Sequence, residues 1–179
     1  MLRTTLIKQA SVLLLSLLAA GCGLTQKVSD GTSSAVTSLF YKQVKTLHLD
    51  ITAREALNTS TQENTSLSEP VMVRVYQLKD SKSFDKMVYQ QLVTEGDAAP
   101  EAGVLTVRNL VVKPGEDAGL DMPLEESAQF VAIVGLFRQP DQTKNDWKII
   151  LARDDLDPDK PRVIEAGNNR LTLQPPEDD

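Results

Sequence analysis

Residues 71–78 read Val-Met-Val-Arg-Val-Tyr-Gln-Leu, and this stretch decides the expected fold. Its valines recur at every second position, which is the period of a β-strand, where successive side chains point to opposite faces. Residues 45–52 show the same period, with leucine and isoleucine alternating with polar side chains, and predict a strand with one wet face. Residues 129–138 are apolar almost throughout, which predicts a central strand.

The other patterned segments are short and are separated by turn-forming residues. Pro123 within residues 119–124 indicates an edge strand, because proline cannot donate a ladder hydrogen bond. About eight strands without alternating βαβ units predict a mainly β fold, a two-sheet antiparallel sandwich with one or two short helices. The remaining predicted elements are helices at 33–41 and 84–94 and strands at 104–113, 119–124, 147–151, 162–165 and 169–174, the last two forming a hairpin across Gly167-Asn168.

The interior of the sandwich is expected to consist of alternate residues within these strands. A change of spacing at Asn109 predicts a bulge or a bend in the strand at 104–113. The predicted core residues are Val73, Val75, Val131, Ile133, Leu171 and Leu173.

The N-terminal residues have the organisation of a secretory signal peptide. Arg3 and Lys8 form a basic head, residues 10–20 are apolar apart from two serines, and small residues precede Cys22. The apolar run is shorter than the roughly 20 residues that span a bilayer. Leu-Ala-Ala-Gly-Cys at 18–22 resembles the lipobox of bacterial lipoproteins, in which the peptide is cut before the cysteine and the cysteine is acylated. The alternatives are an ordinary signal peptide and a cytosolic protein with an apolar N-terminal helix.

The lipobox implies a division of the chain into three parts. Residues 1–21 are the signal peptide, residues 22–32 are the lipidated N-terminus and a small, polar tether, and residues 33–179 form a single β-sandwich domain with helical additions. Three acyl chains on Cys22 exceed the two anchoring signals that stable membrane attachment needs. Gly23, rather than aspartate, follows the cysteine, and in enteric-type bacteria this directs lipoproteins to the outer membrane.

Composition limits the chemistry that the mature chain supports. The 179-residue chain has a net charge of −6, and losing a signal peptide with two bases and no acids brings it to about −8. An acidic body does not suit nucleic acid or an anionic membrane surface. With Cys22 acylated, no thiol remains for a disulfide, a metal or a nucleophile. His48 is the only histidine, and it is expected on the wet face of its strand. One histidine without a free thiol cannot form a zinc site built from cysteine and histidine.

No catalytic constellation stands out. The sequence contains no G-x-S-x-G motif, no P-loop and no glycine-rich dinucleotide fingerprint. Residues 153–161 are rich in aspartate but lack the glycine and the closing glutamate of an EF-hand, which favours a solvated acidic loop over a calcium site.

Several motifs follow one another along the chain in a definite order. After the lipobox come Val-Arg-Val-Tyr-Gln-Leu-Lys at 73–79 with Phe84 behind it, Lys-Pro-Gly-Glu at 113–116, the apolar run at 131–138, and Trp147-Lys148. This order resembles the outer-membrane lipoprotein family of the bacterial type VI secretion system, TssJ. The resemblance implies a transthyretin-like sandwich of two sheets with added helices. It implies no enzymatic activity, no small-molecule substrate and no cofactor other than the acyl chains.

The resemblance also implies a place and a partner. Members lie on the periplasmic face of the outer membrane and hold the periplasmic C-terminal part of a large inner-membrane protein, TssM. They thereby join the two membranes in the secretion envelope complex.

The loop after the first strand, Arg54–Glu69, is the element to which the resemblance assigns partner contact. It has no aliphatic residue from Asn58 to Ser66, and connections longer than about 4–6 residues tend to be functional or disordered. Deleting Asn58–Gln62 is expected to leave the sandwich folded and to weaken partner binding. A solvated loop without a task is the alternative. The predicted partner-binding residues are the amides and hydroxyls of Asn58, Thr59, Ser60, Thr61 and Gln62, with Glu55, Leu57 and Glu63 adding an apolar anchor and charge complementarity.

Two other classes of protein fit a lipid-anchored periplasmic chain. A ligand-binding lipoprotein requires a large apolar pocket with a few converging polar groups. An anchored periplasmic hydrolase requires an acid–base pair with perturbed pKa values in a cleft.

Overall fold

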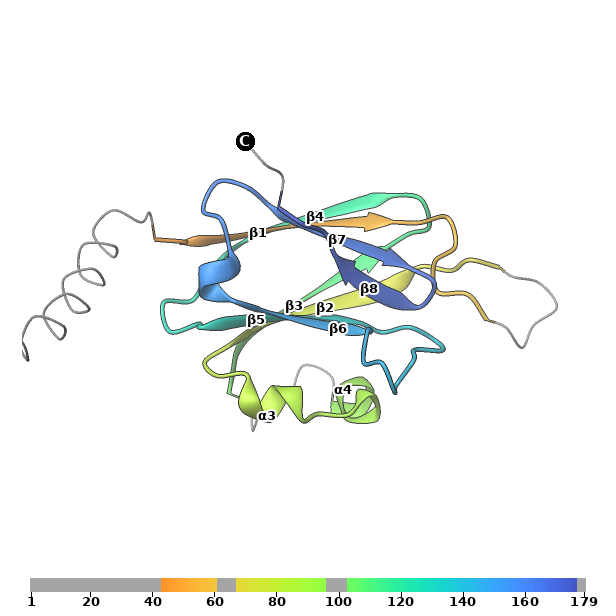
Figure 1. Ribbon diagram of the computed structural model, residues 1–179, viewed down its shortest axis with the longest axis horizontal. Coiled ribbons are helices and arrows are strands. Elements are labelled where there is room, and N and C mark those ends of the chain that lie inside the picture. Colours follow the sequence, from red (N-terminus) through yellow and green to blue (C-terminus); the bar gives the residue numbers. More distant parts are fainter. Residues whose placement is uncertain (1–42, 61–66, 96–102, 177–179) are drawn as a thin grey trace, which may run out of the picture. The chain divides into compact units, whose positions relative to one another are not determined.

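Two four-stranded sheets face each other in the computed structural model (Figure 1). The structure describes residues 43–60, 67–95 and 103–176. The strand order is β4-β1-β7-β8 in one sheet and β3-β2-β5-β6 in the other, which confirms the predicted two-sheet sandwich. The eight strands of the described residues are β1 Thr46–Ala53, β2 Val71–Leu78, β3 Val104–Val112, β4 Asp117–Pro123, β5 Phe130–Gly135, β6 Lys148–Ala152, β7 Arg162–Gly167 and β8 Arg170–Leu173.

Some predictions concern residues outside the described ranges. They are the signal peptide at 1–21, the tether at 22–32 with the lipidation site Cys22 and the sorting residue Gly23, the helix at 33–41, and the loop residues Thr61, Gln62 and Glu63. Their predicted roles stay predictions.

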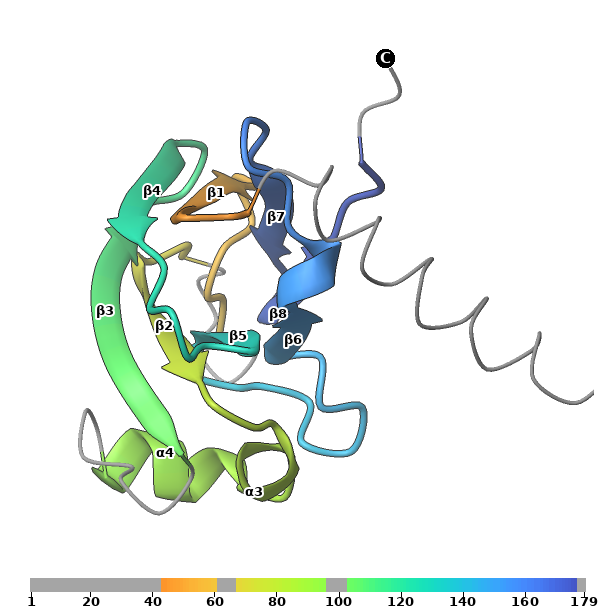
Figure 2. The same cartoon turned by 90° about the vertical axis from the view of Figure 1, so that its left-hand side faces the viewer.

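The two strand positions that the sequence predicts are confirmed, while one pairing departs from the predicted antiparallel arrangement. The apolar β5 lies between β2 and β6, and β4, which contains Pro123, lies at a sheet edge. Figure 2 shows β3 as a long, curved strand along one side of the sandwich. β1 and β7 pair in parallel, with Ile51 opposite Ile164, so the sandwich is not wholly antiparallel. These two strands are far apart in the sequence, and no tight hairpin dictates their relative direction.

One face of each strand fills the space between the sheets. Val73, Val75, Val131, Ile133 and Leu171 are each at most 4% exposed, as predicted. The prediction for Leu173 is wrong, since 36% of this residue is exposed. Leu173 is the last residue of β8, which pairs on one side only, at the edge of its sheet.

Gln77 is a fully buried polar residue that joins the two sheets. Its Nε2 donates to the carbonyl of Pro123, at 2.8 Å, and its Oε1 accepts the N–H of Glu125, at 2.7 Å. Both ends of the amide are satisfied, which removes most of the penalty for burying it. The glutamine therefore fixes β2 of one sheet against the end of β4 in the other.

Replacing this glutamine should be costly. We expect Gln77→Ala to lower the free energy of unfolding by about 2–4 kcal/mol, because it leaves a cavity at a fully buried position and takes the side-chain hydrogen-bond partner from two backbone groups. Urea denaturation measures the difference. Gln142→Ala is the matched control, since Gln142 is exposed and its truncation should change stability by no more than about 0.5 kcal/mol. Equal stabilities for the two variants would contradict the bridging role.

Two short helices, α3 Lys82–Asp85 and α4 Tyr89–Glu95, cover the outer face of the β3-β2-β5-β6 sheet (Figure 1). The guanidinium of Arg74 reaches from β2 to the carbonyl of Leu92 in α4, at 2.9 Å. The rings of Tyr76 and Phe84 pack with centroids 4.9 Å apart. Arg74 thus ties the helical layer to the sheet, which accounts for a buried charge within an apolar strand.

The apolar pattern predicts one helix over 84–94, and the structure instead has a break between α3 and α4. The side chain of Gln91 accepts the N–H of Val88, at 3.2 Å, and so caps the start of α4. The break leaves Val88 56% exposed and brings Tyr89 into the core, at 8% exposure. Local capping therefore overrides the continuous helical period.

Two details of the strands also differ from prediction. The irregularity in β3 lies at Leu105 and not at Asn109, because Leu78 pairs with Val104 while Gln77 pairs with Thr106. The change of spacing near Asn109 arises because the apolar residues before it lie on the outer face of β3, whereas those after it lie on the inner face. The hairpin between β7 and β8 turns at Asn168-Asn169, one residue later than predicted, and both residues have the positive φ that a two-residue hairpin turn requires.

Candidate functional site

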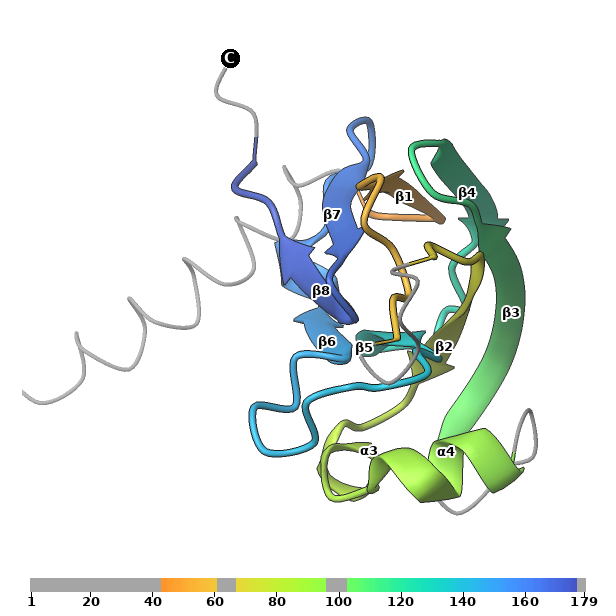
Figure 3. The ribbon, with the colours of Figure 1, turned by 90° about the vertical axis from the view of Figure 1, so that its right-hand side faces the viewer.

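Four chain connections meet at one end of the sandwich, which Figure 3 shows facing the viewer. The N–H of Gly115 donates to the carbonyl of Arg54, with N···O 3.4 Å, and the N–H of Asn168 donates to the carbonyl of Ala56, at 2.8 Å. The backbone that leaves β1 is therefore held from two sides. The four connections are the β1–β2 loop (residues 54–70), the β3–β4 turn (113–116), the β5–β6 connection (136–147) and the β7–β8 turn (168–169).

Leu57 lies inside the domain, contrary to the expectation that it anchors a partner. It is 0% exposed and belongs to the hydrophobic core. Its carbonyl accepts the N–H of Glu69, at 3.1 Å, so the outgoing and returning arms of the loop are joined at this residue. The segment around Leu57 has no apolar periodicity, so the sequence gives no pattern from which the burial of this leucine could be predicted.

Leu57 should therefore matter for stability. We expect Leu57→Ala to lower the free energy of unfolding by about 2–4 kcal/mol, through lost burial and the cavity left behind. Leu67→Ala, in the same loop, is the matched control, because Leu67 is 62% exposed. Its truncation should cost no more than about 0.5 kcal/mol. Denaturation curves that place both variants together would show that Leu57 is not a core residue.

The next three residues of the loop are also bound to the domain. Asn58 is 4% exposed and Ser60 is 7% exposed. Asn169 Nδ2 donates to the carbonyl of Thr59, at 2.8 Å, and Gln139 Nε2 donates to Ser60 Oγ, at 3.4 Å. Deleting residues 58–62 would thus remove the buried contacts of Asn58 and Ser60, so we expect this deletion to cost stability. A replacement limited to residues 61–66 keeps Asn58, Thr59 and Ser60 together with their bonds.

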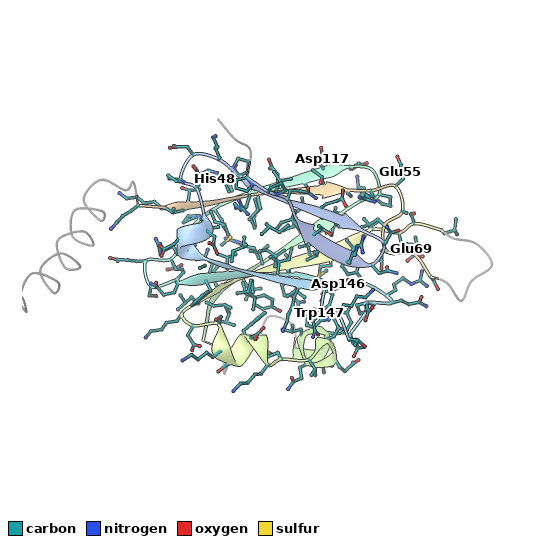
Figure 4. All side chains as sticks on the ribbon, viewed as in Figure 1. His48, Glu55, Glu69, Asp117, Asp146 and Trp147 are labelled. Carbon is teal, nitrogen blue, oxygen red and sulfur yellow. The ribbon has the colours of Figure 1, made fainter. Side chains whose placement is uncertain are left out.

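Charged side chains of both signs surround the loop. Arg138 Nη1 lies 3.0 Å from Glu69 Oε1, and Arg54 Nε lies 2.7 Å from Glu165 Oε1. These pairs are partly exposed, so each is worth at most about 1 kcal/mol to stability. Figure 4 labels Glu55 and Glu69 at this end of the sandwich. The end therefore offers a mixed-charge surface, which suits recognition of a protein more than of a polyanion.

The β5–β6 connection is braced at its beginning and within its tip. The hydroxyl of Tyr89, in α4, donates to the carbonyl of Phe137, and burial raises the pKa of Tyr89 to about 12, so this donor stays protonated at neutral pH. Asp141 Oδ1 accepts the N–H groups of Lys144, at 3.1 Å, and of Thr143, at 3.0 Å. These bonds, that of Lys144 first, hold the pKa of the Asp141 carboxyl below its usual range. The connection next to the loop is thus a formed structure.

Sequence reasoning missed several residues of this end. Arg138, Gln139 and Asn169 contact the loop directly, yet they lie about 70 or more positions away from it along the chain. No periodicity links positions so far apart. The available signal is the asparagines themselves, because asparagine tolerates positive φ better than most residues and therefore marks turns. Asn58 and Asn169 both have positive φ in the structure.

The other titratable candidates lie apart from this end or pair locally. His48 Nδ1 lies 2.5 Å from Asp121 Oδ1, across β1 and β4, in the other half of the view in Figure 4. In the acidic loop, Asp157 Oδ1 accepts the N–H groups of Asp159, at 2.7 Å, and of Lys160, at 2.9 Å. Within residues 43–60, 67–95 and 103–176, no three acidic, histidine or cysteine side chains are grouped to hold a metal ion.

The same residues include no helix with the length and apolar character to cross a membrane.

Comparison with known proteins adds the following similarities. A family profile described as type VI secretion lipoprotein, covering VasD, EvfM and TssJ, matches residues 45–173. No protein with a curated description matches. One chain in a solved structure described as "T6SS protein TssM C-terminal domain (869-1107) from EAEC" is 45% identical, with a TM-score of 0.67 over 74% of this chain and 99% of that chain.

Two further structures share the fold. A chain of a structure described as "Type VI membrane complex" is 45% identical, with a TM-score of 0.69 over 74% of this chain and 100% of that chain. The type VI secretion lipoprotein TssJ1 from Pseudomonas aeruginosa is 17% identical, with a TM-score of 0.57 over 74% of this chain and 98% of that chain. The last likeness concerns the fold alone.

Proposed function

Since the chain belongs to the type VI secretion lipoprotein family, we propose that it joins the two membranes of the secretion envelope complex as a lipid-anchored docking protein. Its acylated Cys22 lies in the outer membrane, and its sandwich domain lies in the periplasm. The end that carries the β1–β2 loop docks the periplasmic C-terminal part of a large inner-membrane protein of the TssM type.

The length of a similar chain supports TssM as the proposed partner. The 45% identical chain is about 130 residues long, because a match over 74% of these 179 residues covers 99% of it. The TssM range given for that structure, 869–1107, is more than 200 residues long. The matched chain is therefore too short to be that TssM domain, and we infer that it was solved as the domain's companion. The second 45% identical chain comes from a membrane complex of the same secretion type.

The membrane anchor is proposed from the sequence. Cleavage before Cys22 and acylation of its thiol and new amine give more than the two anchoring signals that lasting attachment needs. Gly23 in place of aspartate favours the outer membrane. The short polar tether of residues 22–32 then separates the lipid from the domain. The acyl chains are the only non-protein groups in the proposal, which includes no enzymatic activity, no small-molecule substrate and no nucleic acid.

The contact surface is proposed at the loop end. Glu55 and Thr59 border it within the described residues, while Thr61, Gln62 and Glu63 continue it outside them. The buried Leu57, Asn58 and Ser60 support the loop from beneath and are not themselves the surface. Polar groups carried on a rigid platform are typical of recognition loops.

Co-purification from envelopes tests this function. A tagged full-length chain is extracted with detergent from cells that express the secretion system, and its companions are identified by mass spectrometry. We expect one large inner-membrane protein of the TssM type, in an amount comparable to that of the bait. A bait that returns without TssM, or with a bound small molecule in its place, would contradict the docking function and favour a ligand-binding lipoprotein.

A further inference from the structure

Asn58 stands where the outgoing arm of the β1–β2 loop leaves the core. Its φ of +49° lies in the left-handed region, which most side chains avoid. The residue is 4% exposed. Its Nδ2 donates to the carbonyl of Pro70, at 3.0 Å, and its Oδ1 accepts the N–H of Arg138, at 2.8 Å. One side chain therefore joins three segments: the outgoing arm, the returning arm, and the β5–β6 connection.

This double role places narrow demands on the side chain. It requires a donor and an acceptor on one short planar group, and a backbone that tolerates positive φ. Aspartate supplies acceptors only, glycine supplies the backbone conformation only, and glutamine is longer by a methylene group. The amide group is buried, and both its donor and its acceptor are hydrogen-bonded, so asparagine meets the requirements of this position and the three alternatives do not.

Neighbouring contacts hold the same three segments together. The N–H of Glu69 donates to the carbonyl of Leu57, at 3.1 Å, and the carboxylate of Glu69 pairs with Arg138, at 3.0 Å. Asn169 supports the outgoing arm one residue further on, through the carbonyl of Thr59. Both described ends of the loop, residues 54–60 and 67–70, are thus fixed to the domain by contacts within the chain itself.

We infer that Asn58 is a positioning residue, which fixes the two described arms of the β1–β2 loop, residues 54–60 and 67–70, to the β5–β6 connection and so sets one recognition surface before the partner arrives. The inference rests on the proposed docking function and adds the residue that fixes the geometry of the docking end. A surface that is already ordered avoids the entropic cost of ordering its loops on binding. Losing the side-chain bridge should therefore weaken binding even where the domain stays folded.

The first test measures affinity with the lipidated full chain in detergent and the periplasmic C-terminal domain of TssM from the same secretion system. Asn58→Gly keeps the backbone conformation and removes both side-chain bonds, and we expect an affinity loss of about tenfold or more. Asn58→Asp keeps the acceptor for the Arg138 N–H and should lose less. Ser127→Gly is the control, since Ser127 is exposed in the turn between β4 and β5 and belongs to neither segment of the proposed surface. It should bind like the unmodified chain.

A purely structural role predicts a different result. It would lower the unfolding temperature of Asn58→Gly and leave the affinity of the folded protein unchanged. Circular dichroism therefore accompanies each titration, which is run well below the unfolding transition of that variant.

A second measurement needs no substitution and covers the case in which the glycine variant fails to fold. Hydrogen exchange at the Arg138 amide reports the bond to Asn58 directly. In the unmodified free chain this amide should be protected, and binding of the TssM domain should slow its exchange by no more than about threefold. An Arg138 amide that exchanges freely until TssM binds would overturn the inference.

The two proposals fail in distinguishable ways. An unmodified chain that does not bind the TssM domain overturns the docking function, and the positioning role falls with it. An unmodified chain that binds, with Asn58→Gly and Asn58→Asp folded and equally tight, overturns the positioning role alone.

Discussion

A Cys22→Ser variant of the full chain is expected to leave the membrane fraction completely and to accumulate in the periplasm as a folded protein. The hydroxyl of serine does not take the place of the cysteine thiol in lipoprotein acylation, so the variant lacks every acyl chain. Cell fractionation followed by immunoblotting of periplasm and membranes measures the outcome.

Gly23→Asp provides the control for this result. It keeps the acylated cysteine, so the protein should remain membrane-bound but collect in the inner-membrane fraction of a sucrose gradient. Cys22→Ser protein that stays with the outer membrane would show that something other than the lipid holds the chain there. An unchanged position for Gly23→Asp would show that this sorting rule does not govern this protein.

Replacing residues 61–66 with six glycines and serines should abolish docking. We expect the affinity for the TssM C-terminal domain to fall by at least about 100-fold, because the exchange removes the predicted partner-binding residues Thr61, Gln62 and Glu63. Loop length is kept, and the bonds of Leu57, Asn58 and Ser60 are untouched. The domain should therefore unfold at an unchanged denaturant concentration, which separates lost contact from lost structure.

The acidic loop supplies the matched control. Replacing residues 157–160 with glycine and serine alters an exposed connection of similar character elsewhere in the chain. This variant should bind TssM like the unmodified protein. If it lost binding and the first variant did not, the contact would belong to the acidic loop.

The strands could be predicted because each carries its own signal. Alternation identified β1 and β2, a continuous apolar run identified β5 as a central strand, and Pro123 identified the edge strand β4. Each of these patterns depends on burial within one short segment, which the sequence displays directly. The parallel pairing of β1 with β7 has no such local signal, since it depends on how two distant strands enter the same sheet.

The candidate site could be predicted only in outline. The polar stretch after β1 marked a loop, but it did not show that Leu57 belongs to the core or that Asn58 and Ser60 are buried. These facts depend on Pro70, Arg138 and Gln139, which reach the loop through folding and not through sequence neighbourhood. The split between α3 and α4 was missed for a related reason, because one capping bond from Gln91 outweighs a helical period.

The central claim is that this domain docks the periplasmic C-terminal part of TssM through its loop end. Its most direct test is a calorimetric titration of the soluble body, residues 24–179, against the purified C-terminal domain of TssM from the same secretion system. We predict saturable binding with a Kd of about 1 μM or tighter, and its loss on replacement of residues 61–66. No saturable binding up to about 100 μM, with both proteins folded, would contradict the claim.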